Sequence, residues 1–344
     1  MLECLACRKQ WAPVDQHLGL EERQEISPRI RRKLARLGAR MDYVAAAEDL
    51  QYLLGVKVSS KQAQLVTREA GEKALQLEQR QCEEWSRPWS AEHPVKEEKP
   101  HQALVLEMDG TCVLGRKGEG HEIKVATVFG LDERGKSASG REIISERRWA
   151  ATSLGVEAFS PLVHALAVRW GMRGARSMAV VADGAEWIWK LVEDRFAHAT
   201  CILDFWHASE HLHELAAKLW PKDEQKRLRW AGRWSERLRD GQVERLIREL
   251  LRLEKMSCAE RAKALKSERG YFENNRKRCN YPEYVKAGWP IGSGAVEGSC
   301  KSLIKERMAG SGQHWSSDGM EEMAALRTAL FNGDWDNLWQ QDAA

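Results

Sequence analysis

The sequence contains no run of about 18 apolar residues, so it predicts no membrane-spanning helix. Its first residues also lack an apolar core of the length found in signal peptides. Neither sign of charge is in large excess, because the sequence has 54 Lys and Arg side chains and 51 Asp and Glu side chains, a formal net charge of +3. The overall charge therefore does not by itself indicate a nucleic-acid partner. We expect a cytoplasmic protein that does not associate with a membrane.

Cysteine pairs are almost absent as well. Six of the eight cysteines occur singly, at positions 82, 112, 201, 258, 279 and 300, a pattern typical of reduced thiols in the cytosol. Cys4 and Cys7 form one Cys-x-x-Cys pair, whereas a structural zinc site needs four ligands. Two free thiols and half of a zinc ribbon are both open interpretations of this pair.

Apolar and charged residues are present in ordinary proportions. Hydrophobic residues make up 43% and charged residues 31% of the 344 positions, as in globular proteins. Fifteen tryptophans favour a well-packed fold over a disordered chain. This length suffices for one large domain or for two to three smaller ones.

The stretch 27–85 predicts helices that could contact DNA. Residues 27–40 carry six cationic side chains and no acidic one, and residues 43–54 form an amphipathic pattern that Gly55 closes. Ser60 is placed to cap a second helix from residue 61, so the pattern is that of a helix-turn-helix. Two packed helices without a DNA role fit this pattern equally well, but the basic stretch favours DNA. The candidate DNA-binding residues here are Arg29, Arg31, Arg32, Lys33, Lys61, Gln62 and Arg68.

The remaining chain changes its periodicity after a linker. Residues 86–100 contain three prolines and many charges, which is typical of a linker. Strands are predicted at 103–108, 122–129, 142–149, 177–182 and 200–205, with helices at 158–170 and 186–196. This order predicts an α/β fold, a ribonuclease H-like mixed sheet with helices on both faces. Residues 207–288 predict an all-helical insertion, and residues 289–344 return to the core as helices.

Three acids stand out in this arrangement. Asp109 and Asp183 each end an apolar run and each precede a glycine, where a carboxylate projects from a strand end. An Asp-Gly step alone often makes only a turn, but two such steps in one sheet indicate a site. Glu297 lies in a helix that Ser293 is placed to cap. Lys301 and Lys305 follow at spacings of four and suit a polyanionic substrate, although a series of salt bridges would give the same spacing.

Carboxylate ligands of this kind favour Mg²⁺ or Mn²⁺ over zinc. Two such ions at Asp109, Asp183 and Glu297 could drive phosphodiester cleavage, with one activating water or a 3′-hydroxyl and the other stabilising the leaving oxygen. Asp204, His207 and His211 form a further cluster, for which we expect a supporting role near the metals. A structural histidine pair is the alternative for the two histidines.

Several motifs together carry a family resemblance. They are Met108-Asp-Gly-Thr, Val181-Ala-Asp-Gly-Ala-Glu-Trp-Ile-Trp, Ile202-Leu-Asp-Phe-Trp-His-Ala-Ser-Glu-His-Leu, Gly292-Ser-Gly-Ala-Val-Glu, Lys305-Glu-Arg-Met and Gly312-Gln-His-Trp-Ser. With these motifs the chain resembles bacterial DDE transposases of the ISKra type and, more loosely, Mutator-like elements.

The resemblance implies that Asp109, Asp183 and Glu297 are catalytic acids, and that Asp204 and His207 match an Asp-x-x-His motif. It implies a transposase that cleaves the terminal inverted repeats of a transposon and joins the 3′-hydroxyls to target DNA. The enzyme would act as a homo-oligomer in a synaptic complex, associated with the nucleoid. Lys301, Lys305 and Arg307 would contact DNA, and the segment 1–26 around Cys4 and Cys7 would match the second half of a zinc ribbon.

Two other functions fit the same residues. A truncated, non-catalytic DNA-binding protein would keep the helix-turn-helix and lose transposition, and a gel shift combined with a metal-dependent cleavage assay would distinguish it. A ribonuclease H-like nuclease would cleave without strand transfer, so a strand-transfer product would exclude it.

Overall fold

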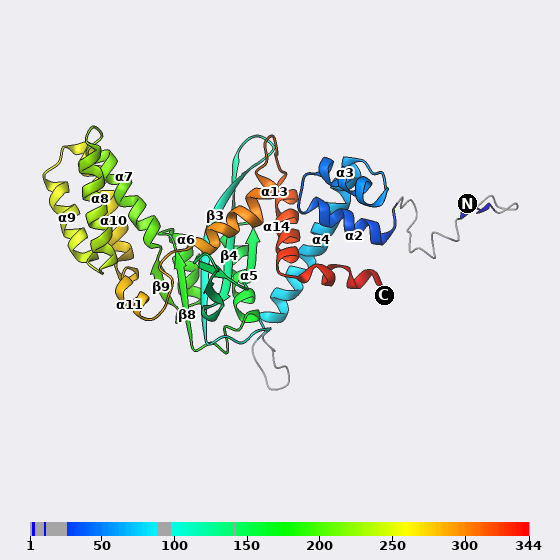
Figure 1. Cartoon of the computed structure of the whole chain (residues 1–344), viewed down its shortest axis with the longest axis horizontal. Helices are drawn as coiled ribbons and strands as arrows, with labels where there is room; N and C mark the ends of the chain where they lie inside the picture. The colour runs from blue at the N-terminus through cyan, green and yellow to red at the C-terminus, as the bar shows by residue number, and fades with distance from the viewer. Residues whose placement is uncertain (1, 4–9, 12–25, 88–97, 141, 344) are drawn as a thin grey trace. The chain divides into compact units, whose positions relative to one another are not determined.

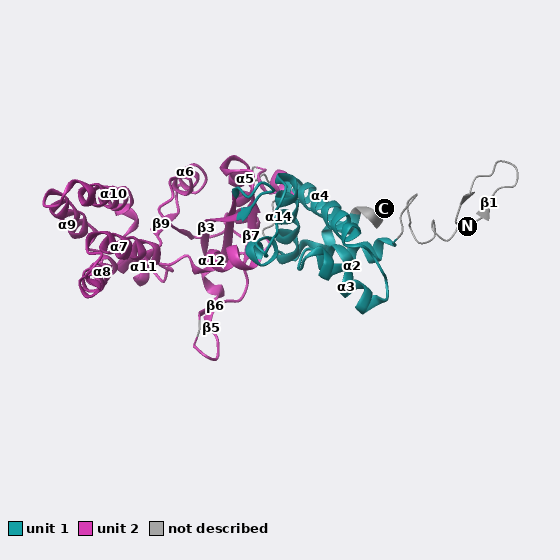
Figure 2. Ribbon diagram, turned by 90° about the horizontal axis from the view of Figure 1, so that it is seen from above, with its two compact units in different colours: residues 1–80, 113–120, 303–344 teal, residues 81–112, 121–302 magenta. Residues whose placement is uncertain are grey.

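The structure is a computed structural model that describes residues 2–3, 10–11, 26–87, 98–140 and 142–343. Cys4, Cys7 and most of the expected linker lie outside the described residues. The chain divides into two compact units (Figure 2). Unit 1 comprises residues 1–80, 113–120 and 303–344, and unit 2 comprises residues 81–112 and 121–302. Within unit 1, the short strands β1 (Leu2–Glu3) and β2 (Gln10–Trp11) pair antiparallel.

A mixed five-stranded sheet forms the centre of unit 2 (Figure 1). Its order is β7 (Arg148–Thr152), β4 (Gly120–Gly130), β3 (Ala103–Leu114), β8 (Ser177–Ala182) and β9 (Thr200–Leu203). β8 runs parallel to both β3 and β9, whereas β7 runs antiparallel to β4. The carboxyl ends of three parallel strands therefore lie at one edge of the sheet.

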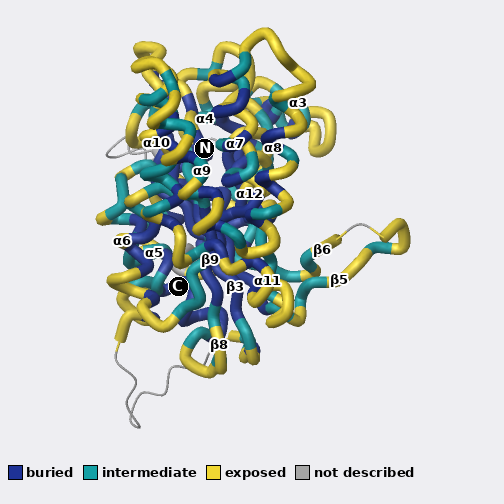
Figure 3. The backbone as a smooth tube through the Cα atoms, turned by 90° about the vertical axis from the view of Figure 1, so that its left-hand side faces the viewer, coloured by how far each residue is buried: buried dark blue, intermediate teal, exposed yellow. Residues whose placement is uncertain are grey.

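Helices cover both faces of this sheet, as the sequence predicts. Because side chains alternate along a strand, Leu104 and Leu106 of β3 pack with α5 (Val156–Arg169) and α6 (Glu186–Arg195). Val105 points to the opposite face, where α7 (Phe205–Leu219) packs. The buried positions follow the strands of the sheet in Figure 3. The expected mixed α/β sheet with helices on both faces is confirmed.

The predicted strand at 142–149 is wrong in its extent. The structure contains two strands here, because β6 (Glu142–Ile144) pairs only with β5 (Arg134–Lys136) in a separate hairpin, and β7 begins at Arg148. The break is fixed by Ser145, whose N–H donates to the carbonyl of Glu133 at the end of the 3₁₀ turn η1 (Leu131–Glu133), and by an ion pair between Glu146 and Lys99. These contacts with residues distant in the sequence interrupt the stretch 142–149, which the sequence pattern predicts as one continuous strand.

Residues 205–286 contain helices and turns but no strand, and the structure describes all of them. After α7 come α8 (Glu224–Arg239), α9 (Val243–Lys255), α10 (Ala259–Asn275), the short η2 (Arg276–Arg278) and α11 (Tyr281–Lys286). Apolar side chains of these helices share one core with the α7 face of the sheet. The segment predicted as a helical insertion is thus helical.

In unit 1, N-terminal and C-terminal helices share a core. The helices are α2 (Pro28–Gly38), α3 (Tyr43–Leu54), α4 (Ser60–Trp85), α14 (Ser317–Phe331) and η4 (Asp334–Ala343). Gly55 ends α3 in the left-handed conformation, with φ of 68°, as its position predicts. Arg307 and Arg327 are buried and donate to the carbonyls of Gly38 and Ala39 at the end of α2. No helix among the described residues is long and apolar enough to cross a membrane.

Candidate functional site

The register of the parallel strands brings three aspartates to one edge of the sheet. Met108 of β3 pairs with Ala182 of β8, and Ala182 pairs with Leu203 of β9. Asp109, Asp183 and Asp204 are the next residue in each case, and the N–H of Asp204 donates to the carbonyl of Ala182 at 2.7 Å. Asp183 and Asp204 therefore follow β8 and β9, whereas Asp109 lies within β3, which continues to Leu114 beyond its pairing with β8; the predicted end of this strand at Met108 is wrong.

The alternation of side chains assigns these acids to a face. Val105 and Val181 belong to the core on the α7 face of the sheet. Because the period of a strand is two residues, Asp109 and Asp183 point toward the same face. Ala295, which lies in α12 (Gly294–Ser299), packs on this face as well. The helix that carries Glu297 is thus on the side of the sheet toward which the two aspartates project.

Two buried carboxylates hold the beginning of α12. Glu107 accepts a hydrogen bond from the N–H of Val296 at 2.9 Å. Asp204 accepts from the N–H of Ser293 at 2.6 Å and from its hydroxyl. The other oxygen of Asp204 accepts from the N–H groups of Trp206 and His207, which caps α7. Both oxygens of Asp204 are therefore engaged in positioning α7 and α12.

The end of α12 is anchored to the sheet. The hydroxyl of Ser299 receives hydrogen bonds from Thr127 of β4 and from the indole of Trp149 of β7, both at 2.8 Å. The chain continues as a π-helix, η3 (Cys300–Lys305), a geometry that is frequent at functional sites. The thiol of Cys300 lies 3.8 Å from the Oδ2 atom of Asp109, so the π-helix contacts the β3 acid directly.

The acids and His207 share one electrostatic environment. Burial raises the pKa of Asp109, and the negative charge of Asp183 raises it further. Burial also raises the pKa of Glu297, with contributions from Asp204 and Asp109, whereas His207 lowers the pKa of both acids. The Nε2 atom of His207 lies 3.7 Å from a carboxylate oxygen of Glu297. One donor atom from each of Asp204, His207 and Glu297 lies within 4.8 Å of the others.

Of the predicted ligands, only Glu297 belongs to this close group; among the described residues, Asp109 and Asp183 do not lie with Glu297 in a group of three donors within 4.8 Å. A bound cation would stabilise the charged forms of Asp109 and Glu297, which burial and, to a lesser extent, the neighbouring carboxylates disfavour. Oxygen donors from Asp109, Asp183 and Glu297 suit Mg²⁺ or Mn²⁺. Asp204 is a poorer ligand than its place in the sequence implies, because its oxygens already accept four hydrogen bonds.

His211 is held by a different set of partners. Its Nδ1 atom lies 2.9 Å from the carboxylate of Glu268, which is the main reason that the pKa of His211 is raised. Its ring stacks on Tyr271 with 4.0 Å between the ring centroids. Tyr271 in turn lies against Gly184, where a Cβ atom would approach the ring to 2.2 Å. A glycine after Asp183 is therefore needed to admit this ring from α10.

Sequence reasoning missed three residues of this site. Glu107 interrupts an apolar strand and is 2% exposed, and its burial raises its pKa to about 8. The sequence does contain one signal that marks Glu107, because it is an acid inside an apolar run. Tyr271 has a buried hydroxyl with no hydrogen-bond partner among the described residues, and burial with the charge of Asp183 raises its pKa. The third is Cys300, and neither it nor Tyr271 carried a distinguishing pattern in the sequence.

The expected DNA-binding residues fall into two groups. Exposed side chains are those of Arg29, Lys33, Lys61, Lys301 and Lys305, and Gln62 is half-buried. The others have protein partners: Arg31 pairs with Glu69, Arg32 with Asp336, and Arg68 forms two hydrogen bonds of 2.7 Å with Glu322. Arg307 is 2% exposed. The five exposed cations are accessible to solvent, and the second group is engaged within the fold.

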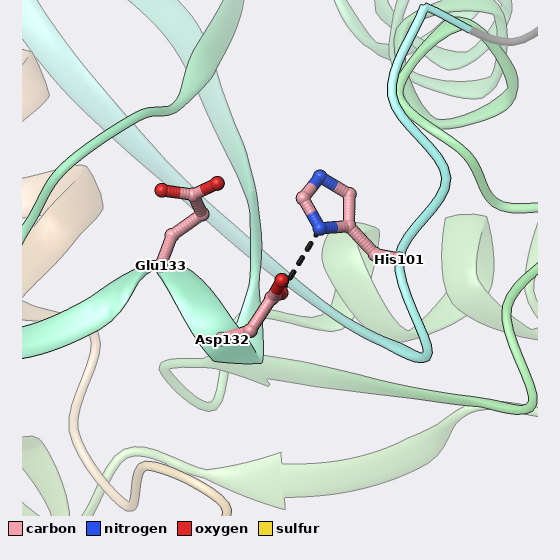
Figure 4. Close-up of side chains that lie close together, drawn as sticks. All are labelled: His101, Asp132 and Glu133. Atoms are coloured by element: carbon pink, nitrogen blue, oxygen red, sulfur yellow. Dashed lines mark hydrogen bonds and ion pairs between the residues drawn. The ribbon is translucent and has the colours of Figure 1, made fainter.

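A second group of possible metal ligands, His101, Asp132 and Glu133, lies at the other end of β3 and β4 (Figure 4). His101 precedes β3 and lies 3.0 Å from Asp132. Glu133 already pairs with Lys99 and accepts from Ser145, which lowers its pKa. This group is accounted for by contacts that tie the chain before β3 to the turn after β4.

Comparison with known proteins places the chain in a family. A family model spans residues 11–340, nearly the whole chain. The chain belongs to the uncharacterised protein family UPF0236. A relative in this family is the UPF0236 protein in the vanSb 3′ region of Streptococcus gallolyticus, which is 25% identical over 334 residues. That match covers 94% of this chain and 68% of the relative. The UPF0236 model spans all of the acids described above, from Glu107 to Glu297.

Proposed function

We propose that this UPF0236 chain is a DNA transposase, which cleaves transposon ends in a metal-dependent reaction and transfers the 3′-hydroxyl into target DNA. The observation that carries the proposal is the register of β3 and β8, which places Asp109 and Asp183 side by side where the pairing of the two strands ends, on the face that α12 covers. Glu297 on α12 completes the set. The order of strands and helices in unit 2 supports a ribonuclease H-like core.

The residues that would hold the metals are Asp109, Asp183 and Glu297. Two Mg²⁺ or Mn²⁺ ions there would activate water or a 3′-hydroxyl and stabilise the leaving oxygen. Asp204 keeps α7 and α12 at a fixed separation by accepting hydrogen bonds from both. His207 orients Glu297 from α7, and the exposed Lys301 on the π-helix is available to a phosphate.

The proposed partners are the terminal inverted repeats and target DNA. Residues 27–85 contain α2, α3 and α4, and the exposed cations Arg29, Lys33 and Lys61 make this region the proposed DNA-binding part. A synaptic complex would contain more than one copy of the chain, because two transposon ends are cut together. The proposal places the protein in the cytoplasm, on the nucleoid when bound to DNA.

The test is cleavage of a DNA duplex that carries the terminal repeats flanking this gene, with Mg²⁺, Mn²⁺ or EDTA. Substitution Asp183→Asn should lower cleavage by about a hundredfold or more, because changes to residues that only support a metal ligand already cost 10- to 100-fold. The matched control is Asp194→Asn, since Asp194 is exposed on α6. A gel shift should show unchanged DNA binding in both variants.

Two results would overturn the proposal. Full cleavage by Asp183→Asn, or cleavage that persists in EDTA, would exclude a metal site at this carboxylate. Metal-dependent cleavage without a strand-transfer product would instead identify a nuclease. Binding to the repeats without any cleavage by the unmodified chain would identify a non-catalytic DNA-binding protein.

A further inference from the structure

Unit 1 contains a pocket of about 460 Å³ that the acids do not line. Four segments of unit 1 form it: the beginnings of α3 and α4, the β3–β4 turn, and the segment from residue 307 to the start of α14. The bridge between Gly115 and Trp315 and the hydrogen bond from Trp315 to the carbonyl of Leu114 join the last two segments. The pocket is therefore a part of the fold of this unit alone.

Three helices begin at this pocket. Its lining includes Asp42 and Tyr43 at the start of α3, Ser60 and Lys61 at the start of α4, and Ser316 with Gly319 at the start of α14. Each helix N-terminus carries a partial positive charge, and the fields of three such ends add where the ends meet. A negatively charged group is favoured in such a place.

The decisive side chain is Arg307, which lines the pocket and is 2% exposed. Its Nε atom donates to the carbonyl of Gly38, and its guanidinium lies over the rings of Tyr43 and Trp315 at 4.7 and 5.1 Å. Its Nη2 atom is buried and has no hydrogen-bond partner within the part of the chain that the structure describes. No carboxylate of the described residues lies within ion-pair distance of Arg307, and the negative charge of Asp42 acts on it only from farther away. A buried cation without an anionic partner is costly, and a bound anion would offset that cost.

Further cations lie around Arg307. Lys61 and Arg116 are exposed on the lining, and neither forms an ion pair with another described residue. Arg68 is neutralised by Glu322, and one oxygen of Asp42, the pocket's one acidic lining residue, caps α3. The uncompensated charge of the pocket is therefore positive.

We propose that this pocket binds a phosphate ester, with Lys61 and Arg116 contacting its oxygens and Arg307 together with the three helix ends supplying the field that holds it. The ester could belong to the backbone of a nucleic-acid strand or to a free nucleotide. The inference rests on and deepens the DNA binding proposed for residues 27–85, which includes Lys61, and it requires neither the three acids nor a metal.

The experiment measures binding of the full chain to a fluorescently labelled single-stranded oligonucleotide in EDTA, where no metal-dependent reaction takes place. The pocket variant is Lys61→Gln combined with Arg116→Gln, and Arg307 is left intact because it supports Gly38. The control variant is Lys57→Gln combined with Arg80→Gln, which removes two exposed cations of unit 1 that do not line the pocket. Thermal melting verifies that all three proteins fold.

We expect the pocket variant to bind the oligonucleotide at least tenfold more weakly and the control variant to bind within about twofold of the unmodified chain. Inorganic phosphate and a mononucleotide serve as competitors and are compared with the unlabelled oligonucleotide. If the mononucleotide competes as well as the oligonucleotide, the ligand is a free phosphate ester. If it competes at least a hundredfold more weakly, the ligand is a strand. Unchanged binding in the pocket variant, or an equal loss in both variants, would overturn the proposal. Equal binding of an oligonucleotide with an uncharged methylphosphonate backbone would also overturn it.

Discussion

At the scale of single residues, Asp204 is an acid whose carboxylate oxygens accept hydrogen bonds from two helices of the candidate site. Its four hydrogen bonds link the beginning of α7 to the beginning of α12. The sequence places Asp204 beside His207 and predicts a supporting role, but it does not show that Ser293, 89 positions later, is the partner. A hydrogen bond over this separation depends on the fold and leaves no local pattern.

His211 gives a pH-dependent prediction at the same scale. The Glu268 carboxylate raises the pKa of His211 above its usual value of 6.5, with smaller contributions from Glu214 and Asp183. A raised folded pKa means that this stabilisation is complete below about pH 6.5 and is lost as the pH rises through the folded value. Because His211 is half-exposed, we expect the charged pair to contribute less than about 1 kcal/mol.

The measurement is urea unfolding of the unmodified chain and of His211→Gln from pH 5.5 to pH 9. The unmodified chain should be the more stable at low pH, and the difference should shrink as the pH rises. The control is His198→Gln, since His198 is exposed. This variant keeps the pair of His211 and Glu268, so the loss of stability seen in His211→Gln should be absent from it. A difference that grows with pH would contradict the assignment.

At the scale of elements, α12 is a six-residue helix that cannot be stable by itself. Its position comes from Glu107 and Asp204 at one end and from Ser299 at the other. The sequence predicts the first residue of this helix correctly, but the expected cap is wrong, because the hydroxyl of Ser293 donates to Asp204 and not to the helix. The π-helix that follows is not predictable from local sequence, since its residues Cys300, Leu303 and Ile304 are buried in the fold and Cys300 contacts Asp109.

Ser293→Ala tests this account of α12. The substitution removes one hydrogen bond to Asp204 and keeps the backbone one, so we expect a loss of about 1 kcal/mol in the free energy of unfolding. Cleavage should fall by up to about tenfold at saturating DNA, with unchanged DNA binding, because Glu297 is less well positioned.

The control for α12 is Ser209→Ala, which removes a hydroxyl contact with Ser235 between α7 and α8 and leaves α12 intact. It should show a similar loss of stability and full cleavage. If both variants cleave equally well, Ser293 has no positioning role.

At the scale of the whole molecule, distant parts of the chain build unit 1. Leu34, Leu50 and Val66 of the N-terminal helices share a core with Leu326 and Trp335 from the last part of the chain. The sequence predicts the N-terminal helices and the C-terminal helices separately. Their association follows from apolar faces that neither group can bury alone, and no local pattern names the partner of such a face.

Leu326→Ala tests this association. Leu326 is fully buried, so the substitution should lower the stability of unit 1 by 2–5 kcal/mol. Hydrogen exchange should rise in α2 and α3 as well as in α14. Leu228→Ala, at a site that is 57% exposed, should have almost no effect on stability. Protection of α2 and α3 that is unchanged in Leu326→Ala would show that the two groups of helices are independent.

The sequence by itself determined the strand that ends before Asp183, the helical segment after β9, and the acids proposed to hold metal; the strand predicted to end before Asp109 instead continues through it to Leu114. Strand periodicity and the positions of glycines are local features, so they can be predicted from the sequence without the tertiary structure. Only the tertiary structure decided that Met108, Ala182 and Leu203 are in register, that Asp204 is a tether between two helices, and that Glu107 is buried beside α12. It also decided that Arg307 is buried at a pocket of unit 1. These outcomes depend on which surfaces meet, and contacts between distant segments are set by packing and hydrogen bonding that no single segment specifies.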